Sequence, residues 1–366
     1  MTKPVWFAGG GTGGHLYPGL AIARALVTVD PEVRPFFIGA RRGIERTVLP
    51  ATEFPHALLD LHPLYRARPW ENWRTIGGAI GAWSELRSLA RRDRPRLLVG
   101  TGGYAAGVAQ AFAVANGIPI VQQAGDSHPG LTARAFRRWT GEFYLAFPEA
   151  ARLLGGDPAR YIDTGAPIEA PPSPHPDRAA ARGAWSFPSA GGPVLLIYGG
   201  SQGSRAINVV VADWIRSGLP EELRLIWMTG KATFDEFKAF ESDRVRVREY
   251  LSPIADAYAA ADLALARAGA MTTAELFAWG IPPILVPLPT AAADHQSVNA
   301  RTLAAAGAAV HLPQGEYSVE RLDRVVRGLI ENPDALARLR TGAVARARPD
   351  AAEVIGRRIA ALLKGR

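Results

Sequence analysis

The sequence predicts an α/β protein made of two doubly wound domains, each with a parallel sheet. The chain has 366 residues, and a single hydrophobic core stops growing at about 250–300 residues, so two domains are expected. Short apolar runs alternate with longer amphipathic segments along the whole chain, as in proteins with parallel sheets. A strand that runs into a glycine loop and a helix occurs in each half, at residues 5–15 and 195–204. Two such domains facing one another would bring both loops to one cleft.

The expected strands are short apolar runs bounded by turn residues. They lie at residues 5–8, 35–38, 97–99, 119–122, 194–198, 223–228, 245–248, 263–266 and 284–286. Helices are expected between them, the first at residues 16–27. The uncharged stretch 97–125 exceeds the ~20 residues that span a bilayer, but glycines and a proline interrupt it. It is therefore predicted to form a strand, a loop, a helix and a strand.

A proline-rich stretch is expected to separate the two domains. Residues 167–176 read PIEAPPSPHP. Proline fixes its φ angle and lacks an amide hydrogen, so neither a helix nor a central strand continues through such a stretch. We therefore predict an N-terminal domain at residues 1–165, a linker at 166–176 and a C-terminal domain at 177–349.

The composition narrows the function classes. A chain with 48% hydrophobic and 21% charged residues is typical of globular proteins, not of disordered or collagen-like ones. The absence of cysteine excludes thiol catalysis and Cys-ligated metals. The apolar run at residues 5–8 is too short for a signal-peptide core, so a cytoplasmic protein is expected. The net charge of +8 suits nucleic acid, an anionic membrane or an anionic small substrate, or serves solubility alone.

The first glycine loop, residues 9–14, contains the pattern G-x-G-x-x-G, which alone is a weak sign of a dinucleotide site. The next strand ends at Arg41 and Arg42 instead of the acid that would hold an NAD ribose. NAD is therefore disfavoured, whereas the 2′-phosphate of NADP stays compatible. Successive glycines at the start of a helix expose backbone amides, which favours contact with a phosphate over a plain tight turn.

Two side chains beside glycine loops are candidates for chemistry. His15 follows the first loop on the first turn of its helix, where it could act as a base or bond a diphosphate. A structural role is the more common one for a single histidine. A third glycine cluster, residues 100–103, follows a strand and ends at Tyr104, which could be a core aromatic residue or a substrate contact.

The second half carries two further polar segments after strands. The segment 267–275 begins a helix whose N-terminal amides suit a diphosphate. Glu275, one turn in, could bond a vicinal diol such as a ribose, or only stabilise the helix dipole. Residues 294–300 (DHQSVNA) follow the strand at 284–286, and their polar side chains indicate either a ligand or a solvated helix start.

Taken together, these segments resemble the MurG family of glycosyltransferases. The motifs that carry the resemblance run in family order along nearly the whole chain: GGGTGGHLYPGLAIARAL from Gly9, GTGGYAAG from Gly100, PGLTAR from Pro129, TGAP from Thr164, YGGSQGSRAIN from Tyr198, RAGAMTTAELFAWGIPPILVPLP from Arg267 and DHQSVNA from Asp294. The resemblance implies a GT-B fold, with two Rossmann-like domains across a cleft and a C-terminal helix, about residues 350–366, that packs on the first. It also implies transfer of N-acetylglucosamine (GlcNAc) from UDP-GlcNAc to the undecaprenyl-linked acceptor lipid I, forming lipid II in peptidoglycan synthesis.

The resemblance also assigns residues to the substrates. The residues at family positions for UDP-GlcNAc are Thr12, Gly13, Gly14, Ser201, Leu251, Ala270, Met271, Thr272, Thr273, Ala274, Glu275, His295 and Gln296. The first three would lie near the sugar and diphosphate, and the last two near the sugar. Ser201 would contact the phosphates, Leu251 the uracil through its backbone, and Glu275 the ribose hydroxyls. Tyr104 and Asn208 match further family positions near the site.

Two departures from the family pattern affect the acceptor side. The family typically reads His-Glu-Gln-Asn where this chain reads Gln123-Ala124-Gly125-Asp126. Two potentially catalytic side chains are thus replaced, and only Asp126 keeps comparable hydrogen-bonding capacity. Glu169 stands where the family has an arginine expected to meet a phosphate. Its charge would repel a diphosphate, so that contact is expected to come from elsewhere.

The mechanism implied is a single inverting step. The acceptor's 4-hydroxyl would attack the anomeric carbon of GlcNAc from the face opposite UDP, with His15 favoured as the base and Asp126 as its competitor. Helix N-termini and loop amides would stabilise the departing diphosphate. No Asp-x-Asp pair stands in a suitable loop, so neither a metal nor a cofactor is expected.

A lipid-linked acceptor requires contact with the membrane, which we expect to be peripheral and on the cytoplasmic face of the inner membrane. The segment 65–92 carries apolar residues at helical spacing: Trp70, Trp73, Ile76, Ile80 and Trp83. Arginines flank them: Arg66, Arg68, Arg74, Arg87, Arg91 and Arg92. Such a pattern is typical of an interfacial helix, although a helix that faces a protein core would look the same.

Three alternatives stay open. A GT-B transferase that uses a UDP-sugar with a different acceptor is the nearest, because the His-Glu-Gln-Asn pattern is missing. An NADP-dependent oxidoreductase would use the first glycine loop with Arg41 and Arg42, but the second glycine loop and Glu275 argue against it. A non-catalytic UDP-GlcNAc sensor would bind the nucleotide sugar and release no UDP.

Overall fold

The computed structural model describes residues 2–62, 70, 72–188, 191–200, 202–291 and 294–365, with only the backbone at 72–74 and 76. The chain divides into two compact units, Met1–Glu169 with Asp350–Arg366, and Ala170–Pro349. The boundary after Glu169 falls within the proline-rich stretch. Each unit contains a parallel sheet with helices on both faces, so the predicted fold class is confirmed.

The sheet of the first unit has seven parallel strands within the described residues. In spatial order they are β3 (His56–Leu59), β2 (Val33–Ala40), β1 (Lys3–Gly9), β4 (Leu97–Gly102), β5 (Ile120–Ala124), β6 (Thr140–Leu145) and β7 (Tyr161–Asp163). The helices of this unit are α1 (Gly13–Val29), α2 (Glu45–Val48), α3 (Asn72–Arg92), α4 (Gly103–Ala115), α5 (Leu131–Ala135), α6 (Ala150–Leu154) and α15 (Ala351–Lys364). The strand order reverses between β1 and β4, which is where doubly wound sheets bind their ligands.

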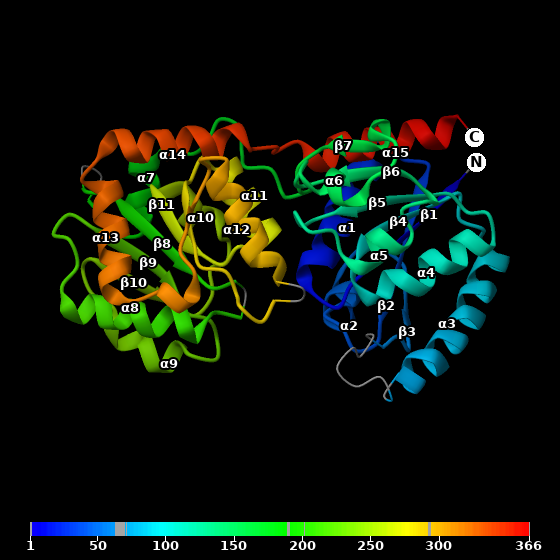
Figure 1. The fold of residues 1–366 in the computed structure, drawn as a ribbon, viewed down its shortest axis with the longest axis horizontal. Helices are drawn as coiled ribbons and strands as arrows, with labels where there is room; N and C mark the ends of the chain where they lie inside the picture. Colours follow the sequence, from blue (N-terminus) through cyan, green and yellow to red (C-terminus); the bar gives the residue numbers. More distant parts are fainter. Residues whose placement is uncertain are drawn as a thin grey trace. The chain divides into compact units, whose positions relative to one another are not determined.

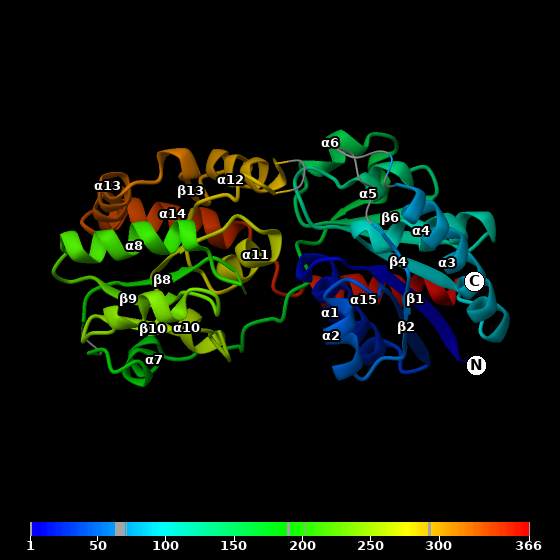
Figure 2. The same ribbon diagram turned by 90° about the horizontal axis from the view of Figure 1, so that it is seen from below.

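Two hydrophobic layers hold the helices on this sheet. On one face, Leu16 and Leu20 of α1 pack with Ile355 and Ile359 of α15. Figure 2 shows these two helices side by side. On the other face, α3 and α4 cover the sheet through a second cluster that includes Phe112 of α4. The last helix of the chain therefore belongs to the core of the first unit, as Figure 1 shows with α15 beside α1.

The sheet of the second unit has six parallel strands within the described residues. In spatial order they are β10 (Val245–Arg248), β9 (Arg224–Met228), β8 (Val194–Tyr198), β11 (Leu263–Ala266), β12 (Pro283–Leu285) and β13 (Val310–His311). The helices are α7 (Arg178–Ala184), α8 (Arg205–Ser217), α9 (Phe234–Phe237), α10 (Ala255–Ala260), α11 (Ala270–Ala278), α12 (His295–Ala305), α13 (Val319–Ile330) and α14 (Pro333–Ala345). Helices α8 and α13 pack on one face, and α10 and α11 on the other.

A buried carboxylate ties three elements of the second unit together. Asp262 is nearly buried and precedes β11. Its carboxylate bonds Arg178 and Arg182 of α7 and accepts the Val194 amide of β8. The Arg340 side chain of α14 donates to the Asp262 carbonyl oxygen at 3.2 Å. Charges on both sides offset the cost of burying this carboxylate.

All nine predicted strands are present, and four further strands were missed. Those four are β3, β6, β7 and β13. Three of them are short or lie at a sheet edge, and β6 begins with the polar sequence Thr-Gly-Glu, so none shows a continuous apolar run. Among the described residues, no helix combines the length and the apolar character that crossing a bilayer requires.

Candidate active site at the strand ends

The first glycine loop connects β1 to α1, and part of its backbone is already bonded. The Gly10 amide donates to the Gly102 carbonyl oxygen at 3.3 Å, and the Gly11 amide donates to Oε1 of Glu45 at 2.9 Å. These two amides are therefore committed within the protein. The exposed residues at the start of α1, Thr12 and Gly14, are the part of the loop that stands open to solvent.

Glu45 is a buried carboxylate beneath this loop that sequence reasoning missed. Its side chain is fully buried, and Oε1 also accepts the Ala40 amide at 3.1 Å. A Cβ atom at Gly10 or Gly43 would overlap the carboxylate, so both positions need glycine for space. Oε2 has no hydrogen-bond partner among the described residues. The carboxylate thus fixes the loop to the end of β2.

His15 lies against the third glycine cluster, and its surroundings set its tautomer. Nδ1 is 3.1 Å from the Thr101 carbonyl oxygen, and the Thr101 hydroxyl donates to the His15 carbonyl oxygen at 2.6 Å. A carbonyl only accepts, so we assign the ring proton of the neutral imidazole to Nδ1. Nε2 then carries the lone pair, which is the state a general base needs.

Glycines make the room that the His15 ring occupies. Gly102 has φ +100°, and a Cβ atom there would lie 2.8 Å from Nδ1 of His15. Gly103 has φ +76°, and a Cβ atom there would lie 3.0 Å from Cδ2 of the same ring. Gly102 and Gly103 of the third glycine cluster therefore leave the space that the His15 ring fills. The spacing of the glycines in the sequence did not predict this contact.

Tyr104 and Asp126 also lie at this edge of the first sheet. Tyr104 is half-buried on the first turn of α4, and a Cβ atom at Gly11 would lie 2.7 Å from its ring. Asp126 is half-buried two residues beyond the end of β5. Strands β1, β4 and β5 are neighbours and parallel, so the structure gathers His15, Tyr104 and Asp126 at the same sheet edge.

Gln123 at the end of β5 is a further polar residue of this region. Its side chain is 3% exposed, and neither amide atom has a hydrogen-bond partner among the described residues. Its neighbour Gln122 is satisfied, since it accepts from Gln110 and donates to Thr140. An unpartnered buried amide is costly, so Gln123 is a candidate to bond a ligand.

In the second unit, Arg267 joins three loops at the carboxyl end of the sheet. Its Nη2 donates to the Ser204 hydroxyl at 2.7 Å, and its Nη1 donates to the Val286 and Pro287 carbonyl oxygens at 3.0 Å each. Burial lowers the pKa of this guanidinium, which is 7% exposed. No carboxylate in the described part of the chain forms an ion pair with it. Ser201 lies outside the described residues.

The first residues of α11 are the largest group of predicted nucleotide contacts. Ala270, Met271, Thr272 and Ala274 are half-buried, whereas Thr273 is buried and its hydroxyl donates to the Gly269 and Ala270 carbonyl oxygens. The Asn299 side chain donates to the Ala268 carbonyl oxygen at 3.2 Å. These bonds fix the turn before the helix.

Glu275 lies on the second turn of α11 and is half-buried. One of its oxygens, Oε2, accepts a hydrogen bond of 2.8 Å from the Tyr258 hydroxyl. Leu251 is buried in the same hydrophobic cluster as Tyr258. The carboxylate and the Leu251 backbone thus belong to one packed region of the second unit.

Asn208 is placed to support a loop. It is fully buried on α8, and its Nδ2 donates to the Thr229 carbonyl oxygen and the Thr233 hydroxyl, while its Oδ1 accepts from Trp227. A Cβ atom at Gly203 would overlap the same Thr229 carbonyl. Asn208 therefore acts on the second glycine loop through the turn that packs against it.

His295 and Gln296 begin α12, and both are half-buried. The Oε1 atom of Gln296 accepts the Leu288 amide at 3.0 Å, which orients the side chain along the turn that follows β12. Among the described residues, no three His, Asp or Glu side chains gather closely enough to hold a metal ion.

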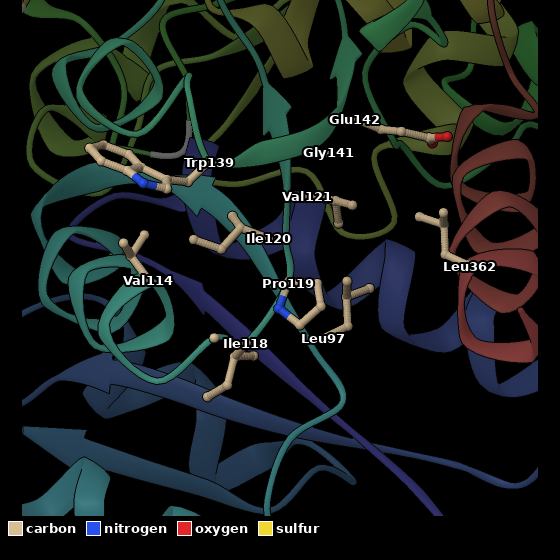
Figure 3. Close-up of a pocket in the computed structure, with 11 residues that line it drawn as sticks. Leu97, Val114, Ile118, Pro119, Ile120, Val121, Trp139, Gly141, Glu142 and Leu362 are labelled. Atoms are coloured by element: carbon tan, nitrogen blue, oxygen red, sulfur yellow. The ribbon is translucent and has the colours of Figure 1, made fainter. Parts of the chain in front are cut away.

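A cavity in the first unit lies away from these loops. It has a volume of about 460 Å³ and is lined by residues at the amino ends of β4 and β5, among them Leu97 and Ile120 (Figure 3). Trp139 and Leu362 also line it. The glycine loops follow the opposite, carboxyl ends of the strands, so this cavity is not part of the candidate active site.

Most of the predicted membrane segment, residues 65–92, forms helix α3, which has a buried and an exposed face. Ala82 and Leu86 are buried against the first unit, whereas Ile80 is 69% and Trp83 is 36% exposed. Trp70, just before the helix, is 70% exposed. The side chains of Trp73, Ile76 and Arg74 lie outside the described residues, as do Arg66 and Arg68 entirely. Arg87, Arg91 and Arg92 are exposed.

The fold and its loops match a known class of enzyme. Residues 5–144 match the glycosyltransferase family 28 N-terminal domain, and residues 194–355 match the glycosyltransferase family 28 C-terminal domain. The two parallel-sheet units, each with a glycine loop after its first strand, are those of a GT-B glycosyltransferase.

Similar proteins indicate which glycosyltransferase family the chain belongs to. A protein of Salinibacter ruber is 37% identical over 372 residues, which cover 98% of this chain and 96% of the relative. A protein of Symbiobacterium thermophilum is 36% identical over 362 residues, 97% of this chain and 95% of the relative. Both are named UDP-N-acetylglucosamine–N-acetylmuramyl-(pentapeptide) pyrophosphoryl-undecaprenol N-acetylglucosamine transferase. The crystal structure of Acinetobacter baumannii MurG is 25% identical and covers 100% of both chains with a TM-score of 0.77. The chain belongs to this MurG family of N-acetylglucosaminyltransferases.

Proposed function

We propose that this chain transfers GlcNAc from UDP-GlcNAc to the 4-hydroxyl of N-acetylmuramic acid in undecaprenyl-pyrophosphoryl-N-acetylmuramoyl-pentapeptide. The observation that carries the proposal is His15, whose Nδ1 faces a carbonyl oxygen and whose Nε2 is therefore the basic nitrogen. The names of the relatives support the same pair of substrates.

The second unit would hold most of the nucleotide sugar. Glu275 would accept from the ribose hydroxyls, and the Leu251 backbone would meet the uracil. The amides that begin α11 would face the diphosphate, where the positive end of the helix dipole favours an anion. Ser201, His295 and Gln296 complete this set, and Thr12, Gly13 and Gly14 of the first unit would approach the sugar and diphosphate.

Arg267 would favour the diphosphate through its charge. Its guanidinium is buried beside the loop that contains Ser204, with hydroxyl and carbonyl oxygens as its bonded partners. A buried cation that lacks a carboxylate gains most from a nearby anion, because few water molecules screen the attraction. Asn208 would keep the second glycine loop in place without touching the substrate.

The first unit would bind the acceptor and carry the base. The acceptor hydroxyl would attack the anomeric carbon while its proton moves to Nε2 of His15, and the bond to UDP would break on the opposite face. The C–O bond that forms replaces the one that breaks, so the sugar inverts and UDP leaves with the bonding pair. Tyr104 and Asp126, at the same sheet edge, would position the acceptor, and Asp126 is the alternative base.

Single-turnover rates of the variants His15→Ala and Asp126→Ala test the assignment of the base. A general base contributes about 10²- to 10⁴-fold, so His15→Ala is expected to slow GlcNAc transfer by that factor while UDP-GlcNAc still binds. An unchanged chemical step in His15→Ala, with a large loss in Asp126→Ala, would assign the base to Asp126 instead.

A transferase with a different acceptor is the second candidate function, and Gln123 is the residue that supports it. Its unpartnered amide stands where the family has a histidine, so the acceptor contacts of this chain differ from the family pattern. UDP release from UDP-GlcNAc, with and without a lipid I analogue, separates the candidates. Release that does not rise with the analogue would remove lipid I as the acceptor.

The exposed apolar face of α3 would contact the membrane peripherally, at the cytoplasmic face of the inner membrane. Ile80 is exposed, Trp83 is partly exposed although its ring also packs on Phe112 of α4, and exposed arginines follow them. Tryptophan and arginine side chains suit the boundary between acyl chains and anionic headgroups.

A further inference from the structure

Three buried or half-buried oxygen groups of the second unit form a chain that ends on Glu275. Tyr198 stands at the end of β8, Tyr258 lies on α10, and Glu275 lies on α11. The two tyrosine hydroxyls are 3.1 Å apart, and the Tyr258 hydroxyl is 2.8 Å from Oε2 of Glu275. Both tyrosines are 3% exposed and belong to the same hydrophobic cluster.

The chemistry of the groups fixes the direction of this chain. An ionised carboxylate only accepts, so the single hydrogen of the Tyr258 hydroxyl goes to Glu275. The Tyr258 oxygen is then the acceptor for the Tyr198 hydroxyl. Burial raises the pKa of both phenols well above their usual range, so both stay protonated in neutral solution and keep this direction.

The consequence for Glu275 is a fixed orientation. A glutamate side chain on an exposed helical turn samples several rotamers, and holding one of them on binding costs free energy. The rigid ring of Tyr258, packed between β8 and α11, removes part of that freedom before any ligand arrives. A carboxylate has about four lone-pair positions, and the bond from Tyr258 occupies one of those on Oε2.

We propose that Tyr258 is a positioning residue for the nucleotide, which holds the Glu275 carboxylate in the orientation that accepts the two ribose hydroxyls. This inference rests on the proposed function, in which Glu275 meets the ribose. Tyr198 stabilises this arrangement, because its hydroxyl donates a hydrogen bond to the Tyr258 oxygen.

Calorimetric binding of two ligands to the full-length protein tests the proposal. The ligands are UDP and 2′,3′-dideoxyuridine 5′-diphosphate, which lacks the diol. Tyr258→Phe keeps the ring and removes the hydroxyl that donates to Glu275. Losing the fixed orientation of the Glu275 carboxylate is expected to cost about two- to ten-fold in affinity for UDP. UDP binding is expected to weaken by that factor, whereas binding of the dideoxy analogue is expected to stay within two-fold of the parent.

Two variants accompany the test. Tyr198→Phe leaves the bond between Tyr258 and Glu275 in place, so a smaller change in the same direction is expected, and this milder variant serves if Tyr258→Phe does not fold. Tyr144→Phe is the matched control, because it also removes a buried hydroxyl that donates to a glutamate, Glu142, but in the first unit. It is expected to change neither dissociation constant.

The outcomes separate this inference from the function on which it rests. Equal weakening of both ligands in Tyr258→Phe would mean that the hydroxyl serves packing alone, and would overturn the proposal. If Glu275→Gln loses the discrimination between the ligands while Tyr258→Phe retains it in full, only the role of Tyr258 fails. If the parent binds both ligands equally, the contact between Glu275 and the ribose fails, and the role of Tyr258 fails with it.

Discussion

At the scale of single residues, the candidate site contains glycines that leave space for the His15 ring. Gly102 and Gly103 adopt positive φ angles, and both lie against the His15 imidazole. The bond between Nδ1 and the Thr101 carbonyl oxygen then holds the ring in one tautomer. Backbone conformation therefore sets the position and the tautomer of the His15 ring.

This arrangement predicts a selective loss of catalysis in Gly102→Ala. The new Cβ atom would lie 2.8 Å from Nδ1, so the imidazole must move. A displacement of about 1 Å at a reacting group can cost on the order of 10²-fold in rate. The single-turnover rate of GlcNAc transfer is expected to fall by about that factor, while the dissociation constant of UDP stays unchanged.

Gly117→Ala is the control for backbone strain. Gly117 also has a positive φ angle, +64°, but nothing lies within 4 Å of its Cβ position. It is expected to lower thermal stability slightly and to leave the rate unchanged. Equal loss of rate in the two variants would mean that strain, not displacement of His15, accounts for the effect.

Part of this residue-level geometry could be predicted from the sequence. The positions of His15 and Tyr104 after glycine loops were sufficient to propose them, because the carboxyl ends of parallel strands share one edge. Glu45 was missed, since its bond to the Gly11 amide joins residues 34 positions apart and depends on the pairing of β1 with β2. Tyr258 was missed for the same reason, because only the packing of α10 on α11 brings it to Glu275.

At the scale of elements, the apolar residues of helix α3 form two surfaces, one packed on the sheet and one exposed to solvent. Periodicity could not decide between an interfacial and a core-facing helix, and the structure contains both faces. Ala82 and Leu86 face the core, Ile80 remains exposed, and Trp83 lies between the two faces, partly exposed and with its ring against Phe112. The four missed strands reflect a related limit, since edge strands such as β7 need little apolar sequence to pair with a preceding strand.

The exposed face of α3 predicts a measurable loss of membrane binding. Burying a large apolar side chain stabilises association by about 1.5–3 kcal/mol, so Ile80→Ser with Trp83→Ser should weaken binding to anionic vesicles at least about ten-fold. Co-sedimentation with vesicles that contain anionic lipid measures this change. Val344→Ser, which removes an exposed apolar side chain of the second unit, is the control and is expected to bind as the parent does.

The result that would contradict this prediction is equal co-sedimentation by the double variant and the parent. Replacing the anionic lipid with a neutral one supplies a second comparison. Exposed arginines such as Arg87 and Arg91 should then contribute less, so binding of the parent is expected to fall as well.

At the scale of the whole molecule, the chain returns to its first unit after completing the second. Helix α15 packs on α1, and its Arg358 forms a salt bridge of 2.8 Å with Glu142 of β6. The close approach of the two helices requires a glycine: a Cβ atom at Gly356 would lie 3.1 Å from backbone atoms of Ala25 and Leu26. The stability of the first unit thus depends on the last residues of the chain.

Gly356→Leu is therefore expected to destabilise the first unit selectively. A bulky side chain would push α15 away from α1, and overpacking of this kind costs about 1–3 kcal/mol. Hydrogen exchange should show faster exchange of the amides of α1, while those of β8 in the second unit keep their protection. Gly328→Leu on α13 is the matched control, since nothing lies within 4 Å of its Cβ position and leucine favours helix more than glycine does. Unchanged protection of α1, or an equal loss in both units, would show that α15 does not stabilise the first unit in this way.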